Sequence, residues 1–300
     1  MLRVTNPGSR AASPGRIFGV LGNPVAQSMS PVLHGWALAQ KNLEGTYTAW
    51  NTPPDALPAF METFRKTPYQ GASVTIPHKE AVIPFLDRLT DTAKIIGAAN
   101  TLFWEKETLV GHNTDMEGFL APLCTLAAPR EALVLGAGGA TRAILAALAT
   151  TGAARVVIAA RDITRGEALA EAFSSALASI RVIPWEDRLC LTPEPDAPFW
   201  AINTTPLGMR GKAEGISPLP REWFAVQTPR HCLAYDLVYN PLETPFLALA
   251  KQAGWQCRDG LDMFIAQAAA QFRLWTGCEM PVPQARALLA EHLAAKPVAP

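Results

Sequence analysis

The segment EALVLGAGGATRAILAALATTGAARVVIAARD, residues 131–162, decides the fold of this chain. An apolar run, a glycine-rich turn, a helical stretch and a second apolar run follow one another, which predicts a βαβ unit. Such a turn lets the backbone approach a pyrophosphate and directs helix N-terminal N–H groups at its charge. Gly136, Gly138 and Gly139 fill this role, although Thr141 occupies the last position of the GxGxxG/A pattern. The segment predicts a dinucleotide site, the alternative being a tight strand–helix turn without a ligand.

The charged residues at the end of the second strand bear on the choice of dinucleotide. They are Arg161, Asp162 and Arg165, in the stretch ARDITR. An acid at this place accepts hydrogen bonds from the ribose of NAD, whereas arginines bind the 2′-phosphate of NADP through a planar fork. The two arginines favour NADP, and Asp162 leaves NAD open. A solvated loop is the alternative interpretation of all three.

Strands and helices alternate on both sides of this unit. Apolar runs predict strands at 16–22, 46–52, 71–77, 199–206 and 232–239. Periodic stretches predict helices at 31–42, 57–67, from Lys79 onward, and at 116–127, 262–277 and 283–295. The segment 98–115 differs, because two apolar runs flank the charged EKE, and it predicts a hairpin. This alternation is typical of an α/β protein with mainly parallel sheets.

The composition excludes several classes of protein. The chain has 300 residues, enough for two domains, with 26 basic and 26 acidic residues and no basic run. We therefore expect no nucleic-acid partner, and no membrane partner because no apolar stretch reaches the ~20 residues of a span. Its five cysteines are odd in number and form no CxxC pair, which argues against disulfides and a metal site and favours the cytoplasm. Residues 1–16 are expected to be a disordered tail, with a transit peptide as the alternative.

Eight segments, in this order along the chain, resemble the shikimate dehydrogenase family. They are GNPVAQSMSPVLH (22–34), VTIPHK (74–79), DTAKIIGAANT (91–101), GHNTD (111–115), GAGGATR (136–142), NTTPLGM (203–209), YDLVYNPLETP (235–245) and GLDMFIAQ (260–267). The resemblance extends from residue 17 to about residue 280. It implies a two-domain α/β fold, with a substrate domain at 17–115 and 260–300 and a Rossmann-like NADP domain at 116–259.

The resemblance also implies an activity, the reversible NADPH-dependent reduction of 3-dehydroshikimate to shikimate on the route to chorismate and the aromatic amino acids. We expect a small-molecule substrate and a monomer or homodimer. The chain departs from the family at its usual NADP motif, NRTxxR, which reads ARDITR at 160–165. A quinate or dual quinate/shikimate dehydrogenase that uses NAD is therefore the alternative function. A non-catalytic NADP-binding regulator on the same fold is the remote one.

Lys79 and Asp115 are, by the resemblance, the catalytic pair. Hydride transfer to or from an alcohol needs a group that exchanges the hydroxyl proton. Pro77 suits the first turn of a helix, so we expect the helix dipole to destabilise the Lys79 ammonium while Asp115 stabilises it. The two groups are expected to titrate as a coupled pair. The alternatives are a solvated lysine and a helix N-cap aspartate.

Ser28 and Ser30 are expected to donate to the substrate carboxylate, because in an extended segment both point the same way. The alternative is a turn or cap before Pro31. The further substrate-binding residues implied by the resemblance are Thr75, Asn100, Tyr239 and Gln267, with Asp115 also contacting the ring hydroxyls. The cofactor-binding residues implied are Gly136, Ala137, Gly138, Gly139, Ala140, Arg161, Asp162, Arg165, Thr204, Leu237, Gly260 and Met263. Taken alone, Tyr239 and Met263 are also typical of a core.

Overall fold

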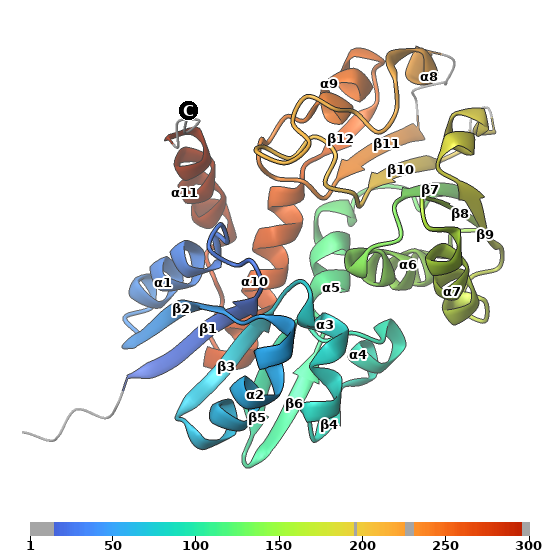
Figure 1. Cartoon of the computed structure of the whole chain (residues 1–300). Helices are drawn as coiled ribbons and strands as arrows, with labels where there is room; N and C mark the ends of the chain where they lie inside the picture. The colour runs from blue at the N-terminus through green and yellow to red at the C-terminus, as the bar shows by residue number, and fades with distance from the viewer. Residues whose placement is uncertain (1–14, 195–196, 226–230, 296–300) are drawn as a thin grey trace, which may run out of the picture.

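The structure is a computed structural model that describes residues 15–194, 197–225 and 231–295. Figure 1 shows two lobes, each built on its own sheet, with α5 (Asp115–Leu120) and α10 (Gly260–Thr276) running between them. Most of the predicted tail, residues 1–14, lies outside the described residues, and Arg16 already belongs to the first strand. The predicted two-domain α/β architecture is confirmed.

The sheet of the first lobe has six strands in the order β2, β1, β3, β5, β6, β4. They are β1 (Arg16–Gly22), β2 (Gly45–Asn51), β3 (Tyr69–Val74), β4 (Arg88–Leu89), β5 (Thr101–Glu105) and β6 (Thr108–His112). All pairs are parallel except those of β5, which runs antiparallel to β3 and β6. The hairpin turns at Lys106, whose φ of 57° lies in the left-handed region. The predicted hairpin and mainly parallel sheet are confirmed.

Helices cover both faces of this first sheet. On one face α1 (Ser30–Gln40), α10 and α11 (Val282–Ala295) share a buried cluster with Val20. On the other face α2 (Leu57–Lys66) packs around Leu21. Successive residues of a strand point to opposite faces, so Val20 and Leu21 enter different cores. The helices at the end of the chain thus return to the sheet formed by its beginning.

The helix predicted from Lys79 is only a single turn, α3 (His78–Ala81), followed by a 3₁₀ turn at Ile83–Phe85. Pro84 prevents its extension, because proline has no N–H for a helical bond and restricts the residue before it. α4 (Asp91–Ile96) completes the lobe. Other 3₁₀ turns lie at Pro54–Ala56, Ala121–Leu123 and Glu186–Cys190.

The sheet of the second lobe has six parallel strands in the order β12, β11, β10, β7, β8, β9. They are β7 (Glu131–Leu135), β8 (Arg155–Ala160), β9 (Ile180–Pro184), β10 (Phe199–Asn203), β11 (Cys232–Asp236) and β12 (Gln256–Arg258). This is the strand order of the dinucleotide-binding doubly wound sheet. The order reverses between β7 and β10, so a crevice is expected beyond Leu135 and Asn203. The predicted Rossmann-like unit is confirmed.

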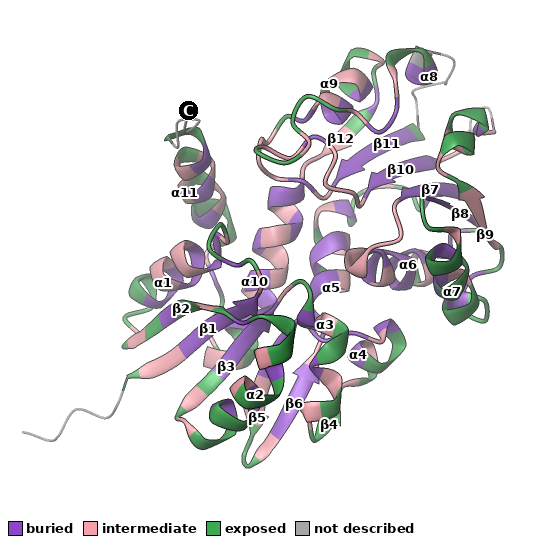
Figure 2. Ribbon diagram, in the orientation of Figure 1, coloured by how far each residue is buried: buried purple, intermediate pink, exposed green. Residues whose placement is uncertain are grey.

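Burial on both faces explains why the central strands of the second sheet are mostly apolar. Every residue of β7, β10 and β11 is buried, as the purple strands in Figure 2 show. α6 (Gly139–Thr151) and α7 (Ile163–Phe173) cover one face, and α8 (Arg221–Ala225) and α9 (Pro245–Gln252) the other. Parallel sheets covered on both sides have near-continuous hydrophobic strands.

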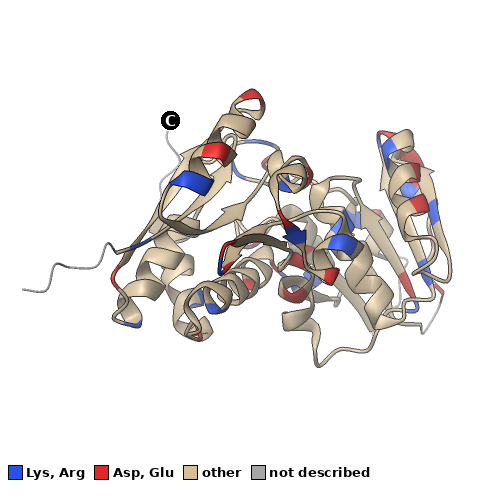
Figure 3. Ribbon diagram, turned by 90° about the horizontal axis from the view of Figure 1, so that it is seen from below, with Lys and Arg blue, Asp and Glu red and all other residues tan. Residues whose placement is uncertain are grey.

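Charged residues of both signs are interspersed over the two lobes (Figure 3). The balance agrees with the equal numbers of basic and acidic residues in the sequence, 26 of each. Within the described part of the chain, no helix combines the length and apolar character that crossing a membrane requires.

His34 of α1 is a deeply buried titratable group. It is 1% exposed, and its ring stacks on Tyr47 with the centroids 4.5 Å apart. Neither ring nitrogen meets hydrogen-bond geometry with a described residue, although the nearby Gln271 side chain opposes the effect of burial on the pKa. Burial lowers the pKa of His34 to about 3, because the apolar surroundings disfavour the imidazolium.

We expect this histidine to make the fold acid-sensitive. Below the ordinary histidine pKa of 6.5, His34 binds a proton in the unfolded chain but stays neutral in the folded chain. The free energy of unfolding should therefore fall by about 2 kcal/mol between pH 6.5 and pH 5. A His34→Phe variant should lack this part of the pH dependence. Urea unfolding of both proteins across this range measures it, and parallel stability curves would contradict the prediction.

Candidate functional site

Lys79 and Asp115 form an ion pair in the first lobe, with 2.5 Å between Lys79 Nζ and Asp115 Oδ2. Their side chains are only 17% and 8% exposed. Lys79 lies on α3, shortly after β3, and Asp115 begins α5, shortly after the β5–β6 hairpin. The Ala99 N–H donates to the Lys79 carbonyl at 2.8 Å and ties α3 to the segment before β5. The structure thus brings together the two groups predicted to act as a pair.

Asn100 holds the Asp115 carboxylate through its second oxygen. Asn100 Nδ2 donates to Asp115 Oδ1 at 2.8 Å, and Asn100 Oδ1 accepts from the Thr114 N–H at 2.9 Å. Gln267 of α10 is adjacent, with its Oε1 3.5 Å from Asn100 Nδ2. The predicted residues Asn100, Asp115 and Gln267 are therefore contiguous, although they come from distant parts of the sequence.

The expected helix-dipole effect on Lys79 is wrong. α3 has four residues and begins after Pro77, which is its N-cap, so the aligned peptide dipoles of a full helix are missing. The N-cap alternative for Asp115 is also wrong, because Thr114 occupies the N-cap position and the Asp115 carboxylate bonds Lys79 and Asn100. The surroundings of Lys79 are therefore defined by its burial and by its ion pair with Asp115.

The sequence predicted that Ser28 and Ser30 lie in an extended segment, and this prediction is wrong. Met29 between them has helical backbone angles, with φ −84° and ψ −3°, and Ser28 Oγ accepts from the Ser30 N–H at 3.2 Å. Such side-chain bonds to the following backbone form a turn that leads into α1. Ser28 is half-buried and keeps its hydroxyl proton for donation, whereas Ser30 is 5% exposed.

Thr75 and Tyr239 follow strands of different lobes, but the Tyr239 side chain packs against the core of the first lobe. Thr75 follows β3, where its methyl group packs so closely on Gly22 that a Cβ added there would lie 2.4 Å away. The Tyr239 ring follows β11 and stacks on Phe264 of α10 with centroids 4.9 Å apart, and burial raises its pKa. Among the hydrogen bonds of the described residues none joins Thr75 or Tyr239 to the ion pair, so their roles stay predictions.

The glycine turn of the second lobe leads from β7 into α6. Gly136 has a φ of +110°, and a Cβ there would lie 2.8 Å from Thr204 Oγ1, so a side chain is excluded on both grounds. Gly138 is the N-cap of α6, and Cβ atoms added at Gly138 or Gly139 would meet open space. The turn, with Ala137 and Ala140, is half-buried.

Thr141, the departure from the glycine pattern, has a structural reason. It is fully buried, and its hydroxyl donates to the Gly136 carbonyl at 3.1 Å and lies 3.0 Å from Thr204 Oγ1. The Thr204 hydroxyl in turn donates to the Leu135 carbonyl at 2.9 Å. Thr141 and Thr204 thus join the loops after β7 and β10 at the crevice.

Asp236, the last residue of β11, is fully buried and joins the end of β10 to the start of α9. Its Oδ1 accepts from Asn203 Nδ2 at 2.9 Å, and its Oδ2 accepts from the Thr244 hydroxyl at 2.6 Å. Burial raises the pKa of Asp236 to about 7, and these donors oppose that rise. Asp236 therefore helps to hold Asn203, the residue before Thr204, in place.

Asp162 serves as the N-cap of α7, where its Oδ1 accepts from the Arg165 N–H at 3.0 Å. One of its two carboxylate oxygens is therefore committed to the helix. Arg161 and Arg165 are both exposed, and neither forms an ion pair with another described residue. The geometry leaves two guanidinium groups open at the end of β8.

Gly260, the first residue of α10, is in close contact with the loop after β11. A Cβ at Gly260 would lie 2.2 Å from the carbonyl oxygen of Leu237, so only glycine fits. Met263, one turn further, is 8% exposed and belongs to the core of the second lobe, and Leu237 packs against the same cluster. The structure brings Leu237, Gly260 and Met263 together, and it places Met263 largely in the core.

Sequence reasoning missed the polar residues behind the ion pair. They are Ser73, Thr101, Thr114 and Gln271, all buried and hydrogen-bonded around Asn100. One signal was available, because Gln271 follows Gln267 by four residues and therefore lies on the same face of the predicted helix.

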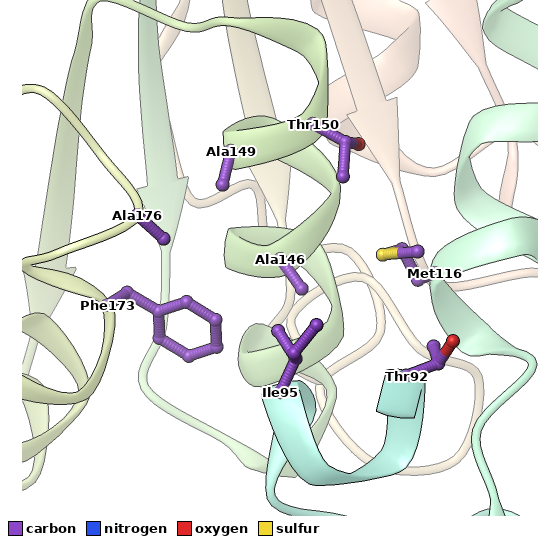
Figure 4. A pocket seen from close by; sticks show the side chains of 8 residues that line it. All are labelled: Thr92, Ile95, Met116, Ala146, Ala149, Thr150, Phe173 and Ala176. Atoms are coloured by element: carbon purple, nitrogen blue, oxygen red, sulfur yellow. The ribbon is translucent and has the colours of Figure 1, made fainter. Parts of the chain in front are cut away.

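A separate hollow of about 280 Å³ lies between α4, α5, α6 and α7 (Figure 4). It is lined by Thr92, Ile95, Met116, Ala146, Ala149, Thr150, Phe173 and Ala176. None of the predicted site residues is among them. A small polyhydroxy acid needs several convergent polar groups, and this largely apolar hollow does not offer them.

Models of three families match successive parts of the chain. They are the shikimate dehydrogenase substrate binding domain at residues 20–102, shikimate / quinate 5-dehydrogenase at 125–205, and the shikimate 5'-dehydrogenase C-terminal domain at 260–289. The shikimate dehydrogenase (NADP(+)) of Oleidesulfovibrio alaskensis is 45% identical over 94% of this chain and 97% of its own length.

Solved structures also resemble the chain over most of its length. A shikimate 5-dehydrogenase from Thermus thermophilus, in complex with NADP(H) and shikimate, is 39% identical with a TM-score of 0.78 and covers 93% of this chain and 99% of its own. A quinate dehydrogenase from Corynebacterium glutamicum in complex with NAD is 26% identical with a TM-score of 0.82, covering 92% and 99%. The chain belongs to the shikimate dehydrogenase family.

Proposed function

We propose that the protein catalyses the reversible, NADP-dependent reduction of 3-dehydroshikimate to shikimate, on the route to chorismate and the aromatic amino acids. The observation that carries the proposal is the buried Lys79–Asp115 pair, braced by Asn100 beside α10. The relative from O. alaskensis and the T. thermophilus complex support the same cofactor and substrate.

We assign residues 17–115 and 260–300 to a substrate domain and residues 116–259 to a cofactor domain. The strands of the first sheet and the α10 and α11 helices that cover it support this division, as do the strands of the second sheet, which all lie between Glu131 and Arg258. We further propose that the protein acts in the cytoplasm as a monomer or homodimer.

NADP fits the chemistry of the cofactor domain. Apart from bonds within α6, no hydrogen bond among the described residues uses the N–H groups of Ala137 or Gly138. This suits a pyrophosphate at the start of α6. Arg161 and Arg165 are exposed and suit the 2′-phosphate. The N-cap role of Asp162 weakens the main sequence argument for NAD. When bound, NADP supplies or accepts the hydride.

Lys79 holds the proton that passes to or from the substrate oxygen. A buried group with a charged partner is well placed for such a transfer, because little water competes for the proton. Asp115 orients Lys79 Nζ, and Asn100 Nδ2 orients Asp115. The proposed substrate contacts are Ser28 and Ser30 for the carboxylate and Thr75, Asn100, Tyr239 and Gln267 for the hydroxyls.

An assay of two substrates against two cofactors tests the proposed function. Shikimate and quinate are each combined with NADP and NAD, and nicotinamide absorbance is followed. We expect shikimate with NADP to give the highest kcat/KM. A preference for quinate with NAD would support the alternative enzyme, and absence of turnover in every combination would support the non-catalytic regulator.

Replacing Lys79 tests its role in proton transfer. We expect Lys79→Ala and Lys79→Met to lower kcat by about 10³-fold while the KM for shikimate changes much less, because the lost group acts in the transition state. Lys66→Ala is the control, since Lys66 pairs with Glu62 on the surface. Thermal unfolding of each variant shows whether it is folded. A folded Lys79→Met variant with an unchanged rate would rule out the assigned role.

Replacing Arg161 tests the cofactor assignment. Arg161→Ala should weaken NADP by about tenfold or more and leave NAD nearly unchanged, because only NADP carries the 2′-phosphate. The exposed Arg181 of β9 provides the control variant Arg181→Ala. Dissociation constants for both cofactors measure the effect, and equal losses for NADP and NAD would remove the 2′-phosphate argument.

A further inference from the structure

Gln271 lies on α10, one helical turn after Gln267, and is 1% exposed. Its Oε1 accepts from Ser73 Oγ at 2.6 Å, and its Nε2 donates to the Asn100 carbonyl and to Thr101 Oγ1, each at 3.0 Å. Both N–H donors and the oxygen are therefore used. The side chain joins α10 to the end of β3 and to the start of β5.

We propose that Gln271 is a positioning residue, which orients Asn100 and, through Asn100, the Asp115 carboxylate that pairs with Lys79. The inference rests on the proposed function of that pair. Among the described hydrogen bonds none joins Gln271 directly to Lys79 or Asp115, so its influence passes through Thr101 and Asn100.

Two backbone groups settle the orientation of both carboxamides. The Asn100 carbonyl can only accept, so the Gln271 atom facing it must be the nitrogen. The Thr114 N–H can only donate, so the Asn100 atom facing it, 2.9 Å away, must be Oδ1. Asn100 Nδ2 then faces Asp115 Oδ1, which suits an ionised carboxylate.

The Thr101 hydroxyl lies between the two carboxamides and has a single proton. It accepts from Gln271 Nε2, so its proton goes to Asn100 Oδ1, 2.7 Å away. Gln271 thereby makes Thr101 a donor to Asn100. That donation adds to the Thr114 bond in keeping Asn100 Nδ2 directed at Asp115.

The chain of hydrogen bonds continues away from the site to Tyr47. The Tyr47 hydroxyl donates to Ser73 Oγ at 2.6 Å, and Ser73 donates to Gln271. Tyr47, Ser73, Asn100 and Thr101 are at most 8% exposed. Solvent therefore cannot easily replace a partner that is lost. Every hydroxyl and amide along this path donates in one direction, toward Asp115.

Loss of the Gln271 donors would release the Thr101 proton to other acceptors, such as the Asn100 carbonyl. Asn100 Oδ1 would then be held by Thr114 alone, and the amide would be directed less firmly at Asp115. A less firmly held Asn100 Nδ2 would leave the Asp115 carboxylate freer to turn away from Lys79.

Three variants separate this role from general damage to α10. Gln271→Met keeps the size but removes the hydrogen bonds, and Gln271→Glu keeps a donor only while its carboxyl is protonated. Ile265→Val is the control, because Ile265 is equally buried on α10 but belongs to the apolar cluster. We expect Gln271→Met to lower kcat about tenfold with the KM for NADP within twofold, and to move the acidic limb of the pH–rate profile.

The activity of Gln271→Glu relative to Gln271→Met should rise as the pH is lowered, since protonation restores a donor. Ile265→Val should keep the parent kcat and pH profile. A Gln271→Met variant that retains the parent kcat and profile would overturn the proposal, as would a loss that Ile265→Val reproduces.

A measurement that does not depend on turnover tests the positioning role of Gln271 separately from the proposed dehydrogenase activity. The side-chain NH₂ signals of Asn100, identified in ¹⁵N spectra by their loss in Asn100→Ser, should shift and broaden in Gln271→Met and stay unchanged in Ile265→Val. Unchanged signals in Gln271→Met would overturn the positioning role, even if the enzyme is active. A parent protein inactive on every substrate, with signals that do shift, would overturn the proposed function alone.

Discussion

A largely buried lysine–aspartate pair is stable only where its remaining hydrogen-bonding capacity is satisfied, and this constraint shapes the first lobe. Asp115 receives Lys79 at one oxygen and Asn100 at the other. Its N–H donates to Asn113 Oδ1 at 2.9 Å, which fixes the start of α5. Lys79 retains donors on its exposed side. Both Asp115 oxygens are therefore bonded within the protein, while Lys79 has donors left for a substrate.

The same constraint gives α10 its importance. Its first residue, Gly260, packs on the loop after β11 of the second lobe, while Gln271 and Trp275 bond to the sheet of the first lobe. Trp275 Nε1 donates to the Leu102 carbonyl at 2.9 Å. A single helix thus holds contacts with both lobes. The position of the ion pair relative to the crevice depends on the integrity of that helix.

Most of the fold and part of the site were predictable from the sequence. The second sheet was clear because burial on both faces requires long apolar strands, and the glycine turn because Gly136 needs a left-handed φ. Lys79, Asp115 and Asn100 were found through motif resemblance. The length of α3 was also readable, since Pro84 prevents its extension, whereas the turn at Met29 depends on local backbone geometry that residue spacing does not report.

By itself the sequence determined the alternation of strands and helices, the dinucleotide turn, and which residues are candidates for the chemistry. Periodicity and glycine placement act locally, so they can be read along the chain. Only the tertiary structure decided that Thr141 lies 3.0 Å from Thr204 and that Gln271 reaches Asn100, 171 residues away. These contacts join segments that the folded sheets bring together, and hydrogen-bond direction depends on distances and partners that no linear pattern contains.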